Sequence, residues 1–216
     1  MISQSVHAIP SVPVIPIAIV LAYLIGGLPF GYWFVRLFTG RDVRNVGSGN
    51  IGATNVHRAA GSKAGLIVLL LDICKGYFAV WLAAFLTGDN IWAVAFAAVA
   101  VMLGHCYPVF LGFKGGKAVA CFVGAFLFIA PLSIAVLIPV FLAVVALTKF
   151  RYISLGSVVG ALLFPLDLWL TGPSPQPVLI AGVFASLLIV LRHRANISRL
   201  IAGKENVFSM KGDSAR

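Results

Sequence analysis

Residues 118–147 read AVACFVGAFLFIAPLSIAVLIPVFLAVVAL, and this run of thirty uncharged residues decides the fold. As one helix it would be about 45 Å long at 1.5 Å per residue. That length exceeds the roughly 30 Å hydrocarbon core of a bilayer. The sequence Ala-Pro-Leu-Ser at 130–133 offers a break, because proline lacks an N–H and disfavours helix in the residue before it. We therefore predict two shorter membrane helices in this run.

The rest of the chain is also apolar. Hydrophobic residues make up 61% of the sequence, only 10% is charged, and the mean hydropathy is +1.04, which excludes an ordinary soluble domain. The first apolar run is interpreted as a retained span, since the initial Met-Ile-Ser-Gln carries no positive charge and the run is too long for a signal peptide. Together with the split run, the chain has seven candidate spans, the other five being Pro13–Val35, Ala64–Leu86, Ile91–Leu103, Ile153–Leu170 and Val178–Leu191.

The basic residues predict the orientation of these spans. With seven spans, the loops at 87–90, 130–133 and 171–177 contain no Lys or Arg, and the basic residues between spans fall on the other side. With six spans, Lys149 and Arg151 would move to the outside. The positive-inside rule therefore favours seven, with the N-terminus out and the C-terminus in. This distribution explains the net charge of +10 without a nucleic-acid partner.

Three polar segments interrupt the apolar chain, and this topology places all of them on the cytoplasmic face. We call them the first island (GSGNIGATNVHR, Gly47–Arg58), the second island (GHCYPVFLGFKGGK, Gly104–Lys117) and the third island (RHRANISRLIAGKE, Arg192–Glu205). Each joins glycine to cationic residues and to Ser, Asn, Thr or His. Backbone N–H groups and cationic side chains bind phosphate, so the islands predict a site for phosphorylated compounds at the membrane surface.

In the first island, glycines would let the backbone approach an anion, hydroxyl and amide side chains could donate to its oxygens, and Arg58 could clamp phosphate. The candidate binding residues are Gly47, Ser48, Gly49, Asn50, Gly52, Thr54, Asn55 and Arg58. A flexible loop that caps the second helix explains the same residues equally well.

The second island ends in Lys114-Gly115-Gly116-Lys117 and leads directly into an apolar helix. Glycines and lysines at a helix N-terminus favour an anion site, and a positive-inside anchor would explain the lysines but not the glycines. The pattern GxxxxGK[ST] is absent, which argues against a Walker A loop. His105, near the start of this island, is either a site residue or a structural hydrogen-bonding group.

In the third island, the spacing of Ile197, Leu200 and Ile201 predicts an interfacial helix over 193–201. Its polar residues either bind substrate or belong to a plain amphipathic anchor. Outside the islands, Asp72 and Lys75 lie three residues apart in the second span and predict a structural ion pair that supports the site. The remaining candidates in this part of the site are His193, Asn196, Arg199, Glu205 and Ser154, the last of which could instead cap its helix.

Several kinds of chemistry find no support. The chain has no Gly-x-Ser-x-Gly elbow and no cluster with metal-ligand spacing, and its three cysteines suggest neither disulfides nor zinc. Carboxylate bases on the cytoplasmic side are limited to Asp42, Glu205 and Asp213. Catalysis would have to rest on positioning and charge stabilisation, with the substrate phosphate itself as a candidate proton acceptor.

The islands resemble, in order, the motifs of the bacterial acyl-phosphate:glycerol-3-phosphate acyltransferase family. They match the patterns GSGNxGATNVxR, GHxxPVFLxFKGGK and RHxxNIxRLxxGxE, and LDICKG at 71–76 and SLGS at 154–157 are also similar. The resemblance runs from about Gly26 to Glu205. Three long motifs in the same order are far more specific than any one of them.

This resemblance implies an all-α integral membrane protein with seven transmembrane helices, N-terminus out and C-terminus in, whose short interfacial helices and cytoplasmic loops form the site. It implies transfer of a fatty acyl group from acyl phosphate to the 1-hydroxyl of glycerol 3-phosphate, giving lysophosphatidic acid and phosphate. This reaction would supply phospholipid synthesis at the bacterial cytoplasmic (inner) membrane, with no cofactor, metal or acyl-enzyme.

The matching motif positions imply roles for individual residues. The loop at Lys114, Gly115 and Gly116 is expected to bind glycerol 3-phosphate, and Glu205 to hold the third island in place. The residues expected to carry activity are Ser48, Arg58, Lys117, His193 and Asn196.

The chain departs from the family pattern at two positions. Where the family often has Gly-Lys-Gly-Val-Ala-Thr, this chain has Ala118 and Cys121 in place of the second glycine and the threonine. Ala118 is expected to continue a helix but to crowd a backbone that approaches phosphate, and Cys121 lacks a hydroxyl donor.

Two other functions fit the sequence less well. A transporter or channel for phosphorylated or other anionic solutes would need polar groups and broken helices at mid-membrane, and usually repeats, whereas polar residues here gather at one face. A non-catalytic scaffold would leave the islands unexplained. The chain is interpreted as one membrane domain, residues 1–205, followed by a short basic tail at 206–216.

Overall fold

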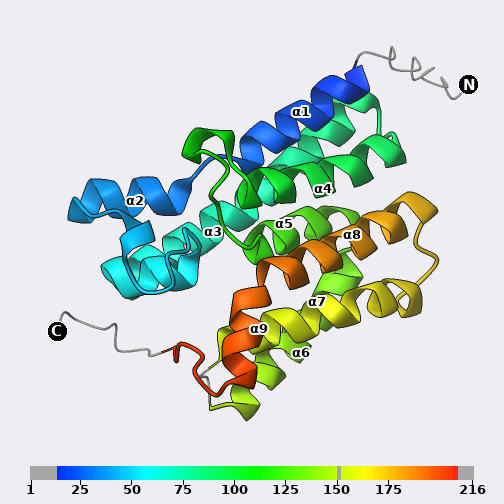
Figure 1. Cartoon of the computed structure of the whole chain (residues 1–216). Helices are drawn as coiled ribbons and strands as arrows, with labels where there is room; N and C mark the ends of the chain where they lie inside the picture. The colour runs from blue at the N-terminus through cyan, green and yellow to red at the C-terminus, as the bar shows by residue number, and fades with distance from the viewer. Residues whose placement is uncertain (1–13, 150–151, 209–216) are drawn as a thin grey trace, which may run out of the picture.

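The computed structural model describes residues 14–149 and 152–208, and every regular element in those ranges is a helix (Figure 1). In chain order the elements are α1 (Val14–Gly26), α2 (Phe30–Thr39), η1 (Val43–Asn45), α3 (Ala53–Thr87), α4 (Ile91–Cys106), η2 (Val109–Leu111), α5 (Val119–Ile129), α6 (Pro131–Leu147), α7 (Ile153–Leu170), α8 (Gln176–Arg192) and α9 (Arg194–Ile201).

The run at 118–147 is broken where the sequence predicts. α5 ends at Ile129, Ala130 leaves the helical conformation with φ −141° and ψ 64°, and Pro131 begins α6. The hydroxyl oxygens of Ser133 and Thr171 lie 2.7 Å apart, so this break and the end of α7 occupy the same end of the molecule. Two helices in place of one are therefore confirmed.

Four helical segments are long and apolar enough to cross a bilayer, and α8 with α9 forms a fifth that is bent by 56°. α5 and α6 are shorter. Large apolar side chains point outward, among them Phe85 (72% exposed) and Leu147 (86% exposed), as contact with lipid tails allows. The chain is an integral membrane protein with seven apolar helical segments in its described residues, at the predicted places. Their count as seven full spans and their orientation stay predictions.

The first predicted span, Pro13–Val35, is present as an apolar segment, but it is broken between two helices. α1 ends at Gly26 and α2 begins at Phe30, and the two form an apolar segment of 26 residues, Val14–Thr39. Pro29 cannot donate a hydrogen bond back to α1. Gly26 also packs so tightly that an added Cβ would lie 2.0 Å from the carbonyl oxygen of Val101 in α4.

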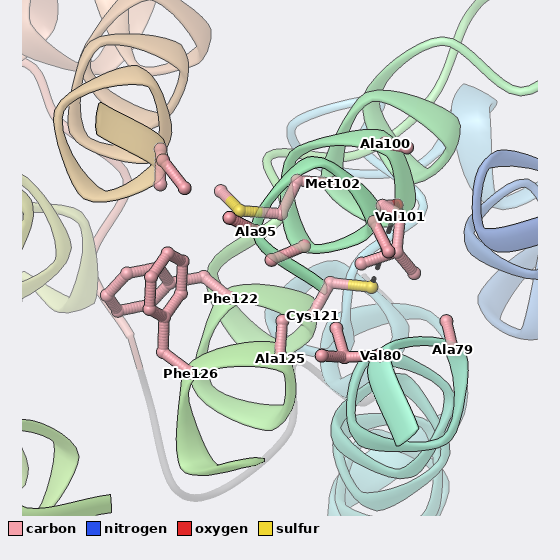
Figure 2. Close-up of a cluster of buried hydrophobic side chains, with 14 of the residues drawn as sticks. Ala79, Val80, Ala95, Ala100, Val101, Met102, Cys121, Phe122, Ala125 and Phe126 are labelled. Carbon is pink, nitrogen blue, oxygen red and sulfur yellow. Dashed lines mark hydrogen bonds between the residues drawn. The ribbon is translucent and has the colours of Figure 1, made fainter. Parts of the chain in front are cut away.

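Small residues bring the central helices together. α5 packs against both α3 and α4 (Figure 1), and a Cβ added at Gly124 of α5 would lie 1.9 Å from the carbonyl oxygen of Ile73 in α3. Such close backbone contact is how membrane helices pack without a hydrophobic driving force between them. Figure 2 shows the Cys121 thiol in this contact, where it donates to the Val101 carbonyl at 4.0 Å. Cys121 is fully buried between helices, so the replacement of the family threonine by cysteine affects helix packing.

A kink divides α3. Gly61 has φ 86° and ψ 174°, a conformation that L side chains rarely adopt, and it separates residues 53–60 from the long membrane helix. The short segment folds back, because a Cβ added at Gly65 would lie 2.7 Å from the Cβ of His57. This fold-back sets the end of the first island against the start of the long helix.

Candidate active site

The three islands meet at one cavity of about 620 Å³. Polar side chains from the island segments line one part of it. The remaining walls are apolar and come from the membrane-spanning parts of α3, α5, α6 and α7, including Leu69, Ile73, Phe122, Leu137, Phe141 and Ala161. An arrangement of this kind can hold a molecule with an ionic head and a hydrocarbon tail.

Most first-island candidates reach the cavity. Its lining includes six of them, namely Ser48, Asn50, Gly52, Thr54, Asn55 and Arg58. Gly47 and Gly49 lie outside the lining and instead form turns, with φ values of 54° and 68°. Glycine is needed there because both positions are in the left-handed region.

The side chain of Asn55 holds the first-island loop together. Its Oδ1 accepts from the Ser48 N–H at 2.9 Å, and its Nδ2 donates to the carbonyls of Val43, Val46 and Asn50. Its polar atoms are therefore occupied by the fold, in contrast to the role in substrate binding expected from the sequence. Ser48 is positioned by this network.

In the second island, Lys117 and His105 line the cavity, but Lys114, Gly115 and Gly116 do not. Lys114 is exposed. The Gly115 and Gly116 N–H groups donate to the carbonyls of Cys106 and His105, and a Cβ added at Gly116 would lie 2.0 Å from His105 Nε2. These glycines permit close packing on the end of α4, and their N–H groups are occupied by it; binding of glycerol 3-phosphate by 114–116 stays a prediction.

Arg192 fixes the same segment. Its guanidinium donates to the carbonyls of Gly115 and Gly116 at 3.0 Å each, and it stacks over the ring of Tyr107 at 4.9 Å. Arg192 was not among the site residues expected from the sequence, although it belongs to the third island. It joins the second and third islands.

Ala118 does not continue a helix as expected. It caps the N-terminus of α5 in the left-handed conformation, with φ 62°, a position that glycine adopts with less strain. The residue lines the cavity beside Lys117. The glycine of the family pattern thus matches the backbone conformation of this position.

A hydrogen-bond network holds the third island. Glu205 accepts from Ser154 Oγ at 2.9 Å, from Asn196 Nδ2 at 2.5 Å and from Arg199 Nε at 2.9 Å. Burial by itself raises the pKa of Glu205, but these three hydrogen bonds lower it below its usual value. Glu205 therefore fixes α9 to α7. Arg199 lies outside the cavity lining, whereas Ser154, Asn196 and Glu205 belong to it.

Lys117 is tied to this network and surrounded by other cations. Its Nζ donates to Asn196 Oδ1 at 2.5 Å. Burial is the main cause that lowers the pKa of Lys117 to about 8. The positive charges of Arg199, Arg58 and Arg192 act in the same direction, and Glu205 opposes them. Positive side chains of all three islands gather here, so the polar part of the cavity is suited to an added anion.

His193 lies at the bend between α8 and α9. Its Nδ1 is 2.8 Å from the Ile189 carbonyl, and the residue is buried in the cavity wall. Burial lowers the pKa of His193 to about 4, and the nearby Lys117 contributes. The ring is therefore neutral at pH 7, and the bond to a carbonyl assigns the proton to Nδ1, which leaves Nε2 as a hydrogen-bond acceptor.

The ion pair between Asp72 and Lys75 forms within α3. The carboxylate and Nζ are 2.7 Å apart and both side chains are 3% exposed. Lys75 also donates to the Leu28 carbonyl at 2.9 Å, and His105 Nδ1 lies 3.6 Å from Asp72. The pair joins the break between α1 and α2 to the α3 face of the cavity, and Asp72 itself belongs to the lining.

Part of the cavity wall was missed from the sequence. His57, Asn206 and Phe208 line the cavity, and the rings of His57 and Phe208 lie 4.8 Å apart. Asn206 and Phe208, which follow Glu205, therefore form part of the cavity wall. The rest of the predicted tail at 206–216 lies outside the described residues. No pattern around Phe208 distinguishes it from an ordinary terminal residue.

Comparison with known proteins agrees with this geometry. A family profile described as glycerol-3-phosphate acyltransferase matches residues 16–203, nearly the whole described chain. The chain belongs to the glycerol-3-phosphate acyltransferase family. It is 45% identical over 192 residues to the glycerol-3-phosphate acyltransferase of Syntrophotalea carbinolica, an alignment that covers 89% of this chain and 96% of that protein.

Two solved structures of the integral membrane glycerol 3-phosphate acyltransferase PlsY share the fold. The glycerol 3-phosphate form has a TM-score of 0.83 and 39% identity, covering 90% of this chain and 96% of that one. The lysophosphatidic acid form has a TM-score of 0.81 and 37% identity, covering 91% and 96%. This acyltransferase therefore has the PlsY membrane fold.

Proposed function

We propose that this membrane acyltransferase moves a fatty acyl group from acyl phosphate to the 1-hydroxyl of glycerol 3-phosphate. The products are lysophosphatidic acid and inorganic phosphate. The single observation that carries the proposal is the cavity itself, where Lys117, Arg58 and the polar islands adjoin an apolar wall within the membrane helices. The forms in which PlsY was solved, with glycerol 3-phosphate and with lysophosphatidic acid, support the same acceptor and product.

The proposed reaction needs little from the protein beyond positioning. The hydroxyl oxygen of glycerol 3-phosphate attacks the acyl carbonyl carbon, the bond from that carbon to the phosphate oxygen breaks, and phosphate leaves with the bridging oxygen. An acyl phosphate is an activated mixed anhydride, so alignment and charge stabilisation can suffice. Lys117 and Arg58 hold the phosphate groups, and Ser48 and Asn196 donate to their oxygens.

His193 has a different role in this proposal. Its neutral ring presents Nε2 to the cavity, where it accepts a hydrogen bond from the attacking hydroxyl and orients it. A pKa of about 4 makes His193 a weak base near neutral pH. The proton is therefore assigned to the substrate phosphate, whose second pKa near 6 makes it the stronger acceptor. A rate that depends on a single protein pKa near neutrality, lost in His193→Gln, would contradict this assignment.

The charge of Lys117 predicts a pH dependence. Because burial lowers the pKa of Lys117 to about 8, the cation is present below this pH and is lost as the pH rises through it. We expect kcat/KM for glycerol 3-phosphate in the wild type to fall above pH 8. In Lys117→Arg, whose guanidinium stays charged, the fall should move to higher pH. An unchanged alkaline fall in Lys117→Arg would assign it to another group.

We further propose that the protein spans the bacterial cytoplasmic membrane seven times, with the N-terminus out and the islands in the cytoplasm. The break at Ala130 and the location of basic residues at the island end support this topology. A reporter enzyme that functions only outside the cytoplasm should be active when it is fused after Ser133. A cytoplasmic reading at that position would contradict the seven-span topology.

The alternative function, transport of anionic solutes, can be separated from acyl transfer in sealed vesicles. Purified protein is reconstituted with acyl phosphate in the membrane and radiolabelled glycerol 3-phosphate outside. The proposal predicts label in a lipid product, with no label free in the lumen. Accumulation of unchanged glycerol 3-phosphate inside the vesicles, without labelled lipid, would favour the transporter.

A further inference from the structure

Gly160 is an unusual glycine in the middle of α7. Glycine weakens a helix relative to alanine, so an interior glycine calls for a reason. Most glycines of the described chain have one. A Cβ added at Gly26, Gly104 or Gly124 would lie about 2 Å from a carbonyl oxygen of a neighbouring helix, so a side chain does not fit there. Other glycines have a positive φ. Of the glycines in the described ranges, Gly160 alone has neither a positive φ nor any atom within 4 Å of an added Cβ.

The empty space beside Gly160 belongs to the cavity. On α7, the lining residues Ile153, Ser157, Gly160 and Ala161 follow the spacing of one helix face, whereas Leu162 is 60% exposed on the opposite side. Gly160 therefore lies in the cavity wall.

The close packing of α7 against α6 at Gly156 is not repeated at Gly160. One turn earlier, a Cβ added at Gly156 would lie 2.7 Å from Val145 and 2.8 Å from Phe141, both on α6. A Cβ added at Gly160 has no atom within 4 Å. The residue lies about 9 Å along the axis from Ser154, at 1.5 Å per residue, and Ser154 binds Glu205 at the polar part of the site. Gly160 thus borders the apolar part of the cavity.

We propose that Gly160 keeps the acyl part of the cavity open and so sets the length of fatty acyl chain that the enzyme accepts. This inference rests on the proposed acyl transfer. A hydrocarbon chain with its carbonyl at the islands would run between α6 and α7 past this position. A side chain at 160 would fill the space that the distal methylenes need, while the ionic groups of the substrates stay in place.

The test compares Gly160→Leu and Gly160→Ala with the wild type, using hexanoyl phosphate, whose chain ends before the level of Gly160, and palmitoyl phosphate as donors in the same lipid. Leu162→Phe is the matched control, because it enlarges a side chain on the outward face of the same helix. In Gly160→Leu, kcat/KM for the palmitoyl donor should fall about tenfold or more relative to the hexanoyl donor. KM for glycerol 3-phosphate should stay unchanged. Gly160→Ala, with one added methyl, should shift the ratio less and in the same direction.

The outcomes distinguish the inference from the function on which it rests. If the wild type turns over neither donor, the proposed acyl transfer is wrong. If the wild type is active but the donor ratio of Gly160→Ala and Gly160→Leu equals that of Leu162→Phe, the acyl chain does not pass Gly160 and only the inference is overturned. If Gly160→Leu does not fold, the ratio in Gly160→Ala alone decides.

Discussion

Lys117→Met is expected to lower kcat/KM for glycerol 3-phosphate by about 10²–10³, the usual cost of removing one preorganised donor from a polar site. Methionine keeps much of the apolar stem of lysine but removes the charge and the hydrogen bond to Asn196. The loss falls on substrate binding and the transition state, because Lys117 lines the polar part of the cavity, close to the positive charges of Arg58 and Arg199. Steady-state kinetics in detergent or lipid measure it directly.

The matched control is Lys114→Met, three residues earlier in the same island. Lys114 is exposed and does not line the cavity, so its kcat/KM should stay within about threefold of the wild type, since loss of an exposed charge costs little. Equal losses in the two variants would mean that general surface charge, and not a specific contact, attracts the substrate. Normal kinetics in Lys117→Met would remove this lysine from the site.

The second large effect is expected on stability. Asp72→Leu should destabilise the protein by about 3–5 kcal/mol, because it leaves the buried ammonium of Lys75 without its carboxylate. Lys75 would keep only the Leu28 carbonyl and its position 5.4 Å from the Phe30 ring. The apparent Tm in a fixed detergent should fall strongly. Activity at low temperature should also fall, because the Asp72–Lys75 ion pair lies beside His105 and the cavity.

The control for that effect is the double variant Asp72→Leu with Lys75→Met. Replacing a whole buried ion pair by apolar residues is often neutral, whereas removing one partner is not. The double variant should recover most of the Tm lost in Asp72→Leu. A Tm as low in the double variant as in the single one would mean that shape at position 72, and not the unpaired charge, causes the loss.

The sequence predicts the helical layout well because membrane helices carry strong signals. Length against bilayer thickness placed a break near Pro131, and the structure has it there. The same reasoning did not reveal the break at Gly26–Pro29, because the run Pro13–Val35 has a suitable length for one span. Two features separate α1 from α2: Pro29, which the sequence shows, and the contact of Gly26 with α4, a tertiary feature that no local pattern records.

The site was predicted unevenly for a related reason. From the sequence we expected the lysine, arginine and histidine residues of the islands to form the site, and Arg58, Lys117 and His193 line the cavity. Glycine was harder to interpret, since a residue that permits close approach serves an anion and a neighbouring helix equally. Gly116 packs on His105, and this use depends on the contact of segments that lie apart in the chain. The apolar wall likewise resembles ordinary core in sequence.

The most direct test of the account supplies purified protein in lipid with glycerol 3-phosphate and two competing donors, palmitoyl phosphate and palmitoyl-CoA. Released phosphate and lysophosphatidic acid are followed together. The account predicts that both products form in equal amounts from palmitoyl phosphate, and that palmitoyl-CoA supplies no acyl group. Lysophosphatidic acid formed from palmitoyl-CoA without phosphate release, or no turnover by folded protein, would contradict direct acyl transfer from an acyl phosphate.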